Sequence, residues 1–180
     1  MTSSELMEQE GEARKGPGTR RVARELALSL LFQRDLEGGT PEETARSFEV
    51  CFSPKKDEEN SLELTAADFN RAWPLAQDLF FGVCRHLPEL DDGISLAAAN
   101  WTLHRMSPVD RGLIRLAYFE ILHRDDIPPK VSLNEALEIA KNYGDDDSGA
   151  FINGVLDRLL RSASVSENIP EAGTFYGQKG

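Results

Sequence analysis

The sequence contains few of the residues that build metal and redox sites. Its 180 residues include only two cysteines, Cys51 and Cys84, and no Cys-x-x-Cys pair. The three histidines, His86, His104 and His123, are scattered along the chain without the spacing of a zinc motif. The sequence therefore predicts no metal ligands and no cofactor.

Motifs of the common enzyme classes are also missing. The chain has no phosphate-binding Walker loop and no Gly-x-Gly-x-x-Gly turn. It has no Gly-x-Ser-x-Gly elbow that would expose a nucleophilic serine. Carboxylates are plentiful, but nothing in their spacing selects a catalytic pair. We therefore expect no catalytic residues and a protein that is not an enzyme.

Long apolar runs are absent as well. No window approaches 18 uninterrupted apolar residues, so the sequence predicts no membrane span. The first residues are polar and acidic and lack the apolar core of a secretory signal. We expect a cytoplasmic protein with free thiols.

Positive charge is scarce but concentrated. The formal net charge is −11, which argues against binding of nucleic acid through the whole surface. Residues 14–34 nevertheless hold six basic side chains against the single acid Glu25. A small basic patch on an acidic body suggests one anionic and one cationic partner, although acidic surfaces often serve only solubility.

Sustained alternation of apolar and polar residues is missing, so the pattern predicts an all-α fold of about seven helices. We expect helices over 19–36, 40–50, 65–86 with a break or kink at Pro74, and 88–101, followed by three between 106 and 160. The expected domain spans 19–162, flanked by a disordered arm (1–18) and a flexible tail (163–180). Residues 53–63 read as a charged loop.

Helix start signals are clearest in the last third of the domain. Ser107-Pro108-Val109-Asp110 has a serine cap with proline at the first helical position. Ser132-Leu133-Asn134-Glu135 has the spacing of a capping box. Gly144 suits a left-handed residue that ends a helix. Asp147 or Ser148 can cap the next helix, and this reading is better than a metal site for Asp145-Asp146-Asp147.

The stretch VDRGLIRLAYFEIL, followed by DIPPKVSLNEALEIAKNYGDDDSGAFINGVLDRLL, resembles the NusB family of transcription antitermination proteins. The resemblance covers the connectors and caps as well as the helices. It implies a helical bundle in two packed subdomains. It also implies a factor that binds boxA RNA of nascent ribosomal RNA together with the small-subunit ribosomal protein NusE.

The first helix offers a candidate RNA surface. Arg21 and Arg24 lie within about 60° of one another on a helical wheel, and Phe32 lies on the same stripe. Arginine binds phosphate and an exposed ring stacks on bases. Spacing alone favours the other reading, in which the arginines form a solvated face and Phe32 is a core residue. The resemblance favours RNA binding, because Arg20, Arg21 and Arg24 occupy the place of the family's arginine-rich segment.

The resemblance implies further RNA-binding residues near the last three helices, namely Asp110, Arg115, Tyr143, Asp147 and Phe151. Without it, Asp110 is a capping residue, Arg115 a solvated side chain, and Tyr143 and Phe151 core aromatics. An acidic side chain at an RNA surface can accept hydrogen bonds from base amino groups, which phosphate contacts cannot read.

The resemblance also implies assembly with other Nus factors in the transcription elongation complex, and some relatives form homodimers. Two alternatives stay open. The chain could be a non-catalytic helical adaptor that binds only proteins. It could also be a NusB-like domain related to those of ribosomal RNA cytosine methyltransferases, although the sequence shows no room for a methyl-transfer fold.

Overall fold

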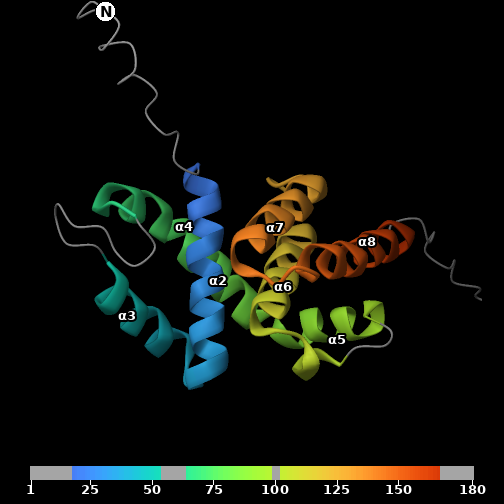
Figure 1. The fold of residues 1–180 in the computed structure, drawn as a ribbon, viewed down its shortest axis with the longest axis horizontal. Helices are drawn as coiled ribbons and strands as arrows, with labels where there is room; N and C mark the ends of the chain where they lie inside the picture. The colour runs from blue at the N-terminus through green and yellow to red at the C-terminus, as the bar shows by residue number, and fades with distance from the viewer. Residues whose placement is uncertain (1–17, 54–63, 99–101, 167–180) are drawn as a thin grey trace, which may run out of the picture. The chain divides into compact units, whose positions relative to one another are not determined.

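The computed structural model describes residues 18–53, 64–98 and 102–166, and all regular elements in these ranges are helices (Figure 1). The α-helices are α2 (Thr19–Glu37), α3 (Pro41–Phe52), α4 (Ala66–Arg85), α5 (Leu87–Ala97), α6 (Pro108–His123), α7 (Pro129–Tyr143) and α8 (Ser148–Ser166). A short 3-10 helix, η1, covers Leu103–Arg105. The predicted all-α class is confirmed. No helix in the described ranges is long and apolar enough to cross a membrane.

The chain divides into two compact units, one ending at Gly82 and the other beginning at Val83. The predicted boundaries at residues 18 and 162 are not tested by this division. Gly18 is the only described residue of the predicted arm, and α8 continues to Ser166 beyond the predicted end of the domain. The remaining residues of the arm and tail, and 54–63 of the charged loop, lie outside the described ranges.

The first unit has its core on α2, α3 and the beginning of α4. Val22, Leu26 and Leu30 of α2 are buried, as the spacing of apolar residues predicted. Aromatic rings join α3 to α4, because Phe48 of α3 stacks on Trp73 of α4 with ring centroids 5.8 Å apart. Within α4, Phe69 stacks on Trp73 at 5.1 Å.

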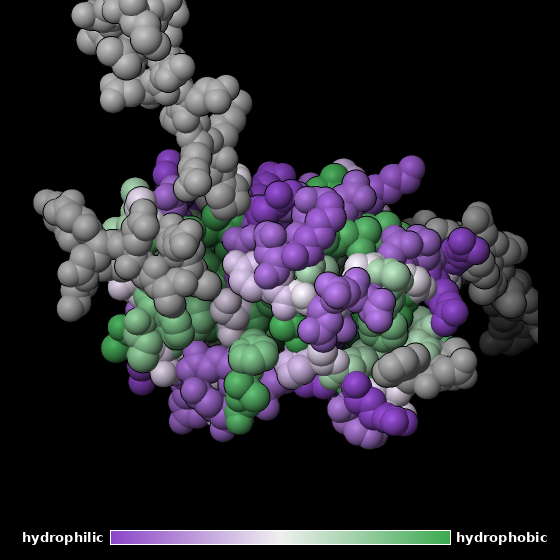
Figure 2. All heavy atoms as spheres, viewed as in Figure 1, coloured by the Kyte–Doolittle hydropathy of each residue, from purple (hydrophilic) through white to green (hydrophobic). Residues whose placement is uncertain are grey.

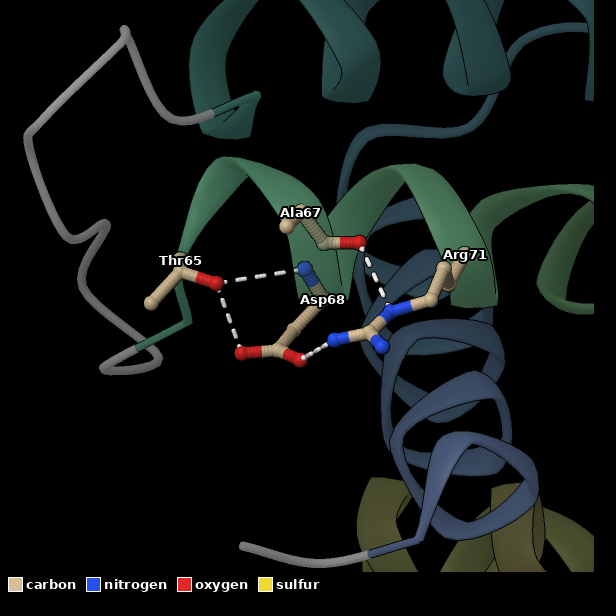
Figure 3. Close-up of polar contacts among 4 residues, drawn as sticks. All are labelled: Thr65, Ala67, Asp68 and Arg71. Carbon is tan, nitrogen blue, oxygen red and sulfur yellow. Dashed lines mark hydrogen bonds and ion pairs between the residues drawn. The ribbon is translucent and has the colours of Figure 1, made fainter.

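The start of α4 has a side-chain cap at Thr65, the first residue of the predicted helix 65–86 (Figure 3). The Thr65 hydroxyl accepts a hydrogen bond from the Asp68 backbone N–H at 3.2 Å and donates one to the Asp68 carboxylate at 2.7 Å. Arg71 also donates to that carboxylate at 2.6 Å. Together these bonds satisfy one of the N–H groups that a helix start leaves without a partner.

Pro74 does not break α4, which continues from Ala66 to Arg85. Of the predicted break or kink, the break is therefore wrong, and the kink stays a prediction. A proline removes one backbone hydrogen bond, but the buried apolar residues on both sides of it, Trp73, Ala76, Leu79 and Phe80, continue one helical pattern. Burial of this face outweighs the single lost bond.

In the second unit α6, α7 and α8 pack against one another, and α5 packs against α6 and α8 (Figure 1). Their shared core includes Leu113, Ile114, Ile139, Ile152 and Leu156. The predicted cap of α6 is confirmed, since the Ser107 hydroxyl accepts from the Asp110 backbone N–H at 3.0 Å and Pro108 is the first helical residue.

The capping box predicted at Ser132 is wrong. Helix α7 begins at Pro129, so Ser132 lies inside it. Proline is well suited to the first helical position, and with Pro128 as the N-cap the helix begins four residues earlier than a cap at Ser132 would place it. The Ser132 hydroxyl instead donates to the buried Glu120 carboxylate of α6 at 2.6 Å.

Gly144 is also not left-handed. Its φ of −92° and ψ of 174° are extended. A glycine is required there because a Cβ would lie 2.7 Å from the Ser148 Oγ atom and 2.8 Å from the Ala140 carbonyl oxygen. The left-handed glycines of the described chain are Gly38 and Gly39, which follow α2 with φ of 70° and 86°.

Candidate nucleic-acid interface

The predicted RNA-binding residues fall in both units, and each group is described by itself. Arg20, Arg21, Arg24 and Phe32 lie on α2 in the first unit. Asp110 and Arg115 lie on α6, and Tyr143, Asp147 and Phe151 lie at the junction of α7 and α8, in the second unit.

The first turn of α2 concentrates positive charge at a helix N-terminus. It contains Arg20 and Arg21 and no acidic residue, and the preceding Gly18 has no side chain to cap it. The helix dipole already places partial positive charge there, so these arginines raise the local potential further. This combination costs helix stability but attracts anions such as phosphate.

The side chains of this group differ in exposure. Arg20 is exposed and Arg21 half-buried, whereas Arg24 is buried and donates to the Arg20 carbonyl oxygen at 3.3 Å. Phe32 is 38% exposed. The reading of solvated arginines with a core phenylalanine is therefore wrong for Arg24 and for Phe32. Arg20 and Phe32 present a guanidinium and an aromatic ring to solvent on one helix.

On α6, both predicted residues are buried. Arg115 donates to the carboxylate of Asp91 on α5 through two parallel bonds, from Nε at 2.7 Å and from Nη2 at 2.8 Å. The reading of Arg115 as a solvated side chain is wrong. Its partner Asp91 was missed, because a pair 24 residues apart has no signal in sequence spacing.

Asp110 lies in the first turn of α6 and is 9% exposed. Among the described residues, no hydrogen-bond partner faces its buried Oδ1 atom. A carboxylate oxygen without a donor is costly to bury, which marks it as an acceptor that a ligand could satisfy. An amino group of a base is one such donor.

The junction of α7 and α8 is a tight turn. Ser148 and Asp145 bond reciprocally, since the Ser148 N–H donates to the Asp145 carbonyl at 3.0 Å and the Ser148 Oγ accepts from the Asp145 N–H at 2.9 Å. Asp147 directly precedes α8, is exposed, and its carbonyl accepts from the Phe151 N–H.

Two aromatics flank this turn. Tyr143, the last residue of α7, is 41% exposed, so its reading as a core aromatic is wrong; Phe151 is half-buried. On the face drawn in Figure 2, hydrophilic residues gather over α7. The exposed polar residues of α7 include Lys130 and Asn134 near its start and Lys141 and Asn142 near the junction. The junction thus combines rings and polar groups at the surface, as a surface that binds bases and phosphates requires.

The sequence and the fold of this chain are similar to those of known proteins. Residues 21–161 match the NusB family. The transcription antitermination protein NusB of Desulforapulum autotrophicum is 44% identical over 142 residues, which cover 79% of this chain and 91% of that protein.

Solved structures agree with the fold. NusB of T. maritima matches with a TM-score of 0.61 at 33% identity, over 79% of this chain and 90% of that one. A chain from a structure of the antitermination factors NusB and NusE in complex with dsRNA matches with a TM-score of 0.65, over 80% and 97% of the two chains. At 24% identity this second likeness shows the fold alone. The chain belongs to the NusB family.

Proposed function

We propose that this chain is a transcription antitermination factor that binds boxA-type RNA of nascent ribosomal RNA together with NusE. The family supports the process, since its members carry that name. The observation that carries the RNA contact is the basic first turn of α2, where two arginines stand at a helix start without an acidic residue or a side-chain cap. A protein selected only for stability would place acids there.

Each unit contributes its own residues to the proposed RNA contacts. Arg20 and Arg21 hold phosphates, and Phe32 offers a stacking face. Asp110, Tyr143, Asp147 and Phe151 supply acceptors and rings that discriminate between bases. Arg24 and Arg115 are buried, so we do not assign them direct contacts with phosphate. We assign them the role of positioning neighbouring groups and of adding positive potential to the surface.

The proposed protein partner is the small basic NusE. One structure of a protein with this fold contains NusB and NusE with dsRNA. The acidic excess of this chain suits a basic partner, because complementary potentials steer association. Assembly with other Nus factors on a cytoplasmic elongation complex, and a homodimer that covers the RNA surface, are further parts of the proposal.

The test is binding of a labelled boxA-type RNA, measured by fluorescence anisotropy with and without NusE. We expect Arg20→Ala with Arg21→Ala to weaken binding at least tenfold, about 1.4 kcal/mol. Loss of two phosphate contacts should also reduce the slope of log affinity against log salt by about 1.4 for a single strand.

The matched control is Arg46→Ala with Arg71→Ala, which removes the same charge from exposed side chains on α3 and α4 of the same unit. It should reduce affinity less than threefold. Equal losses in the two double variants would show that net charge, and not the first turn of α2, governs binding. No binding by the folded parent chain, with or without NusE, would favour a purely protein-binding adaptor.

A further inference from the structure

Two of the three histidines meet at a single carboxylate in the second unit. His86 precedes α5, Glu89 lies in the first turn of α5, and His123 is the last residue of α6. The His86 Nδ1 atom is 3.1 Å from Glu89 Oε2, and the His123 Nε2 atom is 3.0 Å from the same oxygen. Sequence spacing gave no sign of this cluster, because His123 lies 34 residues after Glu89.

The three ligand atoms have the spacing of a metal site. All lie within 4.8 Å of one another. A tetrahedral zinc ion with bonds of about 2.1 Å has ligand atoms about 3.4 Å apart, so the two nitrogen–oxygen distances need to change by only a few tenths of an ångström. Two imidazole nitrogens and one carboxylate oxygen are also the donor types that zinc prefers.

The surroundings hold the two rings in place. The imidazole rings of His86 and His123 lie 3.9 Å apart between centroids, and the Phe119 ring lies 5.8 Å from the first and 5.4 Å from the second. The rings are therefore fixed by packing before any ion arrives, which lowers the entropy cost of binding.

The cluster is also open to solvent. The side chains of His86, His123 and Glu89 are 38%, 27% and 53% exposed. An ion could therefore enter and keep water as its remaining ligand, as in zinc sites with three protein ligands. Burial raises the pKa of Glu89, but hydrogen bonds from both histidines outweigh it, so its pKa lies below the ordinary value and the ligand is anionic at neutral pH.

We propose that His86, Glu89 and His123 form a binding site for a divalent transition-metal ion, with zinc as the best-fitting ion. In the absence of metal, the facing N–H group of each ring donates a hydrogen bond to the Glu89 carboxylate. Zinc takes the place of these two protons, each of which leaves for solvent or for the other nitrogen of its ring. The ion would join the start of α5 to the end of α6. This proposal is independent of the RNA-binding function.

The test is a titration of the full chain, without a histidine tag, with zinc while the ring nitrogens of its three histidines are followed by NMR. We expect the signals of His86 and His123 to change with one equivalent of zinc. The exposed His104 of η1 is an internal reference and should not change at that point. Magnesium should leave all three signals unchanged, because it prefers oxygen ligands.

Variants separate this site from other zinc ligands. We expect Glu89→Gln, which preserves side-chain size, and His123→Gln each to weaken zinc binding at least tenfold, whereas His104→Gln leaves it unchanged. Replacement of Cys51 and Cys84 by serine should also leave it unchanged. Circular dichroism verifies that each variant is folded. Ring signals that stay constant up to about 1 mM zinc, or binding that is lost in the cysteine variant, would overturn the proposal.

Discussion

The buried Arg115 shows how a charged side chain pairs with a partner inside the protein instead of with solvent. Arg115 was expected to face solvent, yet it is 7% exposed and bonds to Asp91 through two nitrogens. The planar guanidinium matches a carboxylate in this parallel geometry, which a lysine could not reproduce. The pair joins α5 to α6, so its first effect is on the stability of the second unit.

We predict that Asp91→Ala and Arg115→Ala each lower the free energy of unfolding by about 1–3 kcal/mol, below the range for fully buried pairs because Asp91 is partly exposed. Each change leaves one charge without this partner. The double variant should lose clearly less than the sum of the single variants. Urea unfolding followed by circular dichroism measures all four proteins, and strictly additive losses would contradict the pairing.

Ser132 illustrates what one residue's sequence context can and cannot tell. Its spacing from Glu135 matches a capping box, but the hydroxyl serves the buried Glu120 on another helix. Local spacing describes only the chain's own backbone. The neighbouring helix becomes visible only when the fold is known, so the bond to Glu120 could not be predicted from sequence, although Pro129 did indicate an earlier helix start.

At the scale of elements, helix ends are specified largely by local chemistry. Thr40 and Glu43 form a complete capping box at the start of α3. At the starts of α4 and α6 the hydroxyls of Thr65 and Ser107 accept from the backbone N–H three residues further on. These starts were predictable because a cap and its partner lie three residues apart. The start of α7 was predicted wrongly, since the tandem prolines at 128 and 129 compete with a capping pattern that begins four residues after the first of them.

The capping box of α3 gives a prediction for pH. Hydrogen bonds from the Thr40 backbone and side chain lower the pKa of Glu43. A carboxylate whose pKa is lower in the folded state stabilises it above the unfolded value near 4.5, and this contribution is lost as the pH falls through the lower folded value.

The stability difference between the parent chain and Glu43→Gln should therefore be constant from about pH 7 to pH 5 and shrink below about pH 4.5. Thermal unfolding across this range measures it. Glu42→Gln, a first-turn change outside the box, shows the part that arises from charge near the helix start alone. Identical pH profiles for the two variants would show that the capping box does not cause the pH dependence.

Gly144, which follows α7, and Gly154, which lies inside α8, provide a matched pair of substitutions. We predict that Gly144→Ala destabilises the protein by about 1–3 kcal/mol, because its Cβ would overlap the Ala140 carbonyl and Ser148. Gly154→Ala inside α8 meets no atom within 4 Å and should stabilise the protein by about 0.5–1 kcal/mol. Opposite shifts in melting temperature are expected, and equal shifts would contradict this account.

The candidate interface was predictable to a different degree than the helices. Periodicity places Arg21 and Phe32 on one stripe of a helix, but only the resemblance to the NusB family selected them, together with Arg20, as RNA-binding residues. The burial of Arg24 and Arg115, the exposure of Tyr143 and the unpartnered Asp110 oxygen depend on packing between helices, which the spacing of residues along one helix does not contain.

At the scale of the whole molecule, the dominant property is the separation of charge. The chain carries a net charge of −11, yet its basic residues concentrate between positions 14 and 34. In the proposed function, such a distribution would repel RNA from the acidic surface and attract it to the basic first turn of α2. Repulsion of RNA by the acidic surface would then contribute to specificity, because it disfavours binding anywhere else.

This separation predicts how the protein partner should bind. Association with basic NusE should slow at least tenfold between about 0.1 M and 1 M salt, since the screening length falls from about 10 Å to about 3 Å. Dissociation should change much less. Surface plasmon resonance at several salt concentrations measures both rates, and an effect confined to dissociation would show that long-range steering is absent.

The aromatic stack of the first unit has a practical consequence for all these measurements. Trp73 is 7% exposed and lies against Phe48 and Phe69, so water and its quenching dipoles are largely kept from the indole. The unit thus carries its own optical probe, with emission that moves to longer wavelength when the stack opens. In a variant whose second tryptophan, Trp101, is replaced, opening of the stack that joins α3 to α4 can be followed by fluorescence, without a label on the protein, in the same cuvette as the binding reaction.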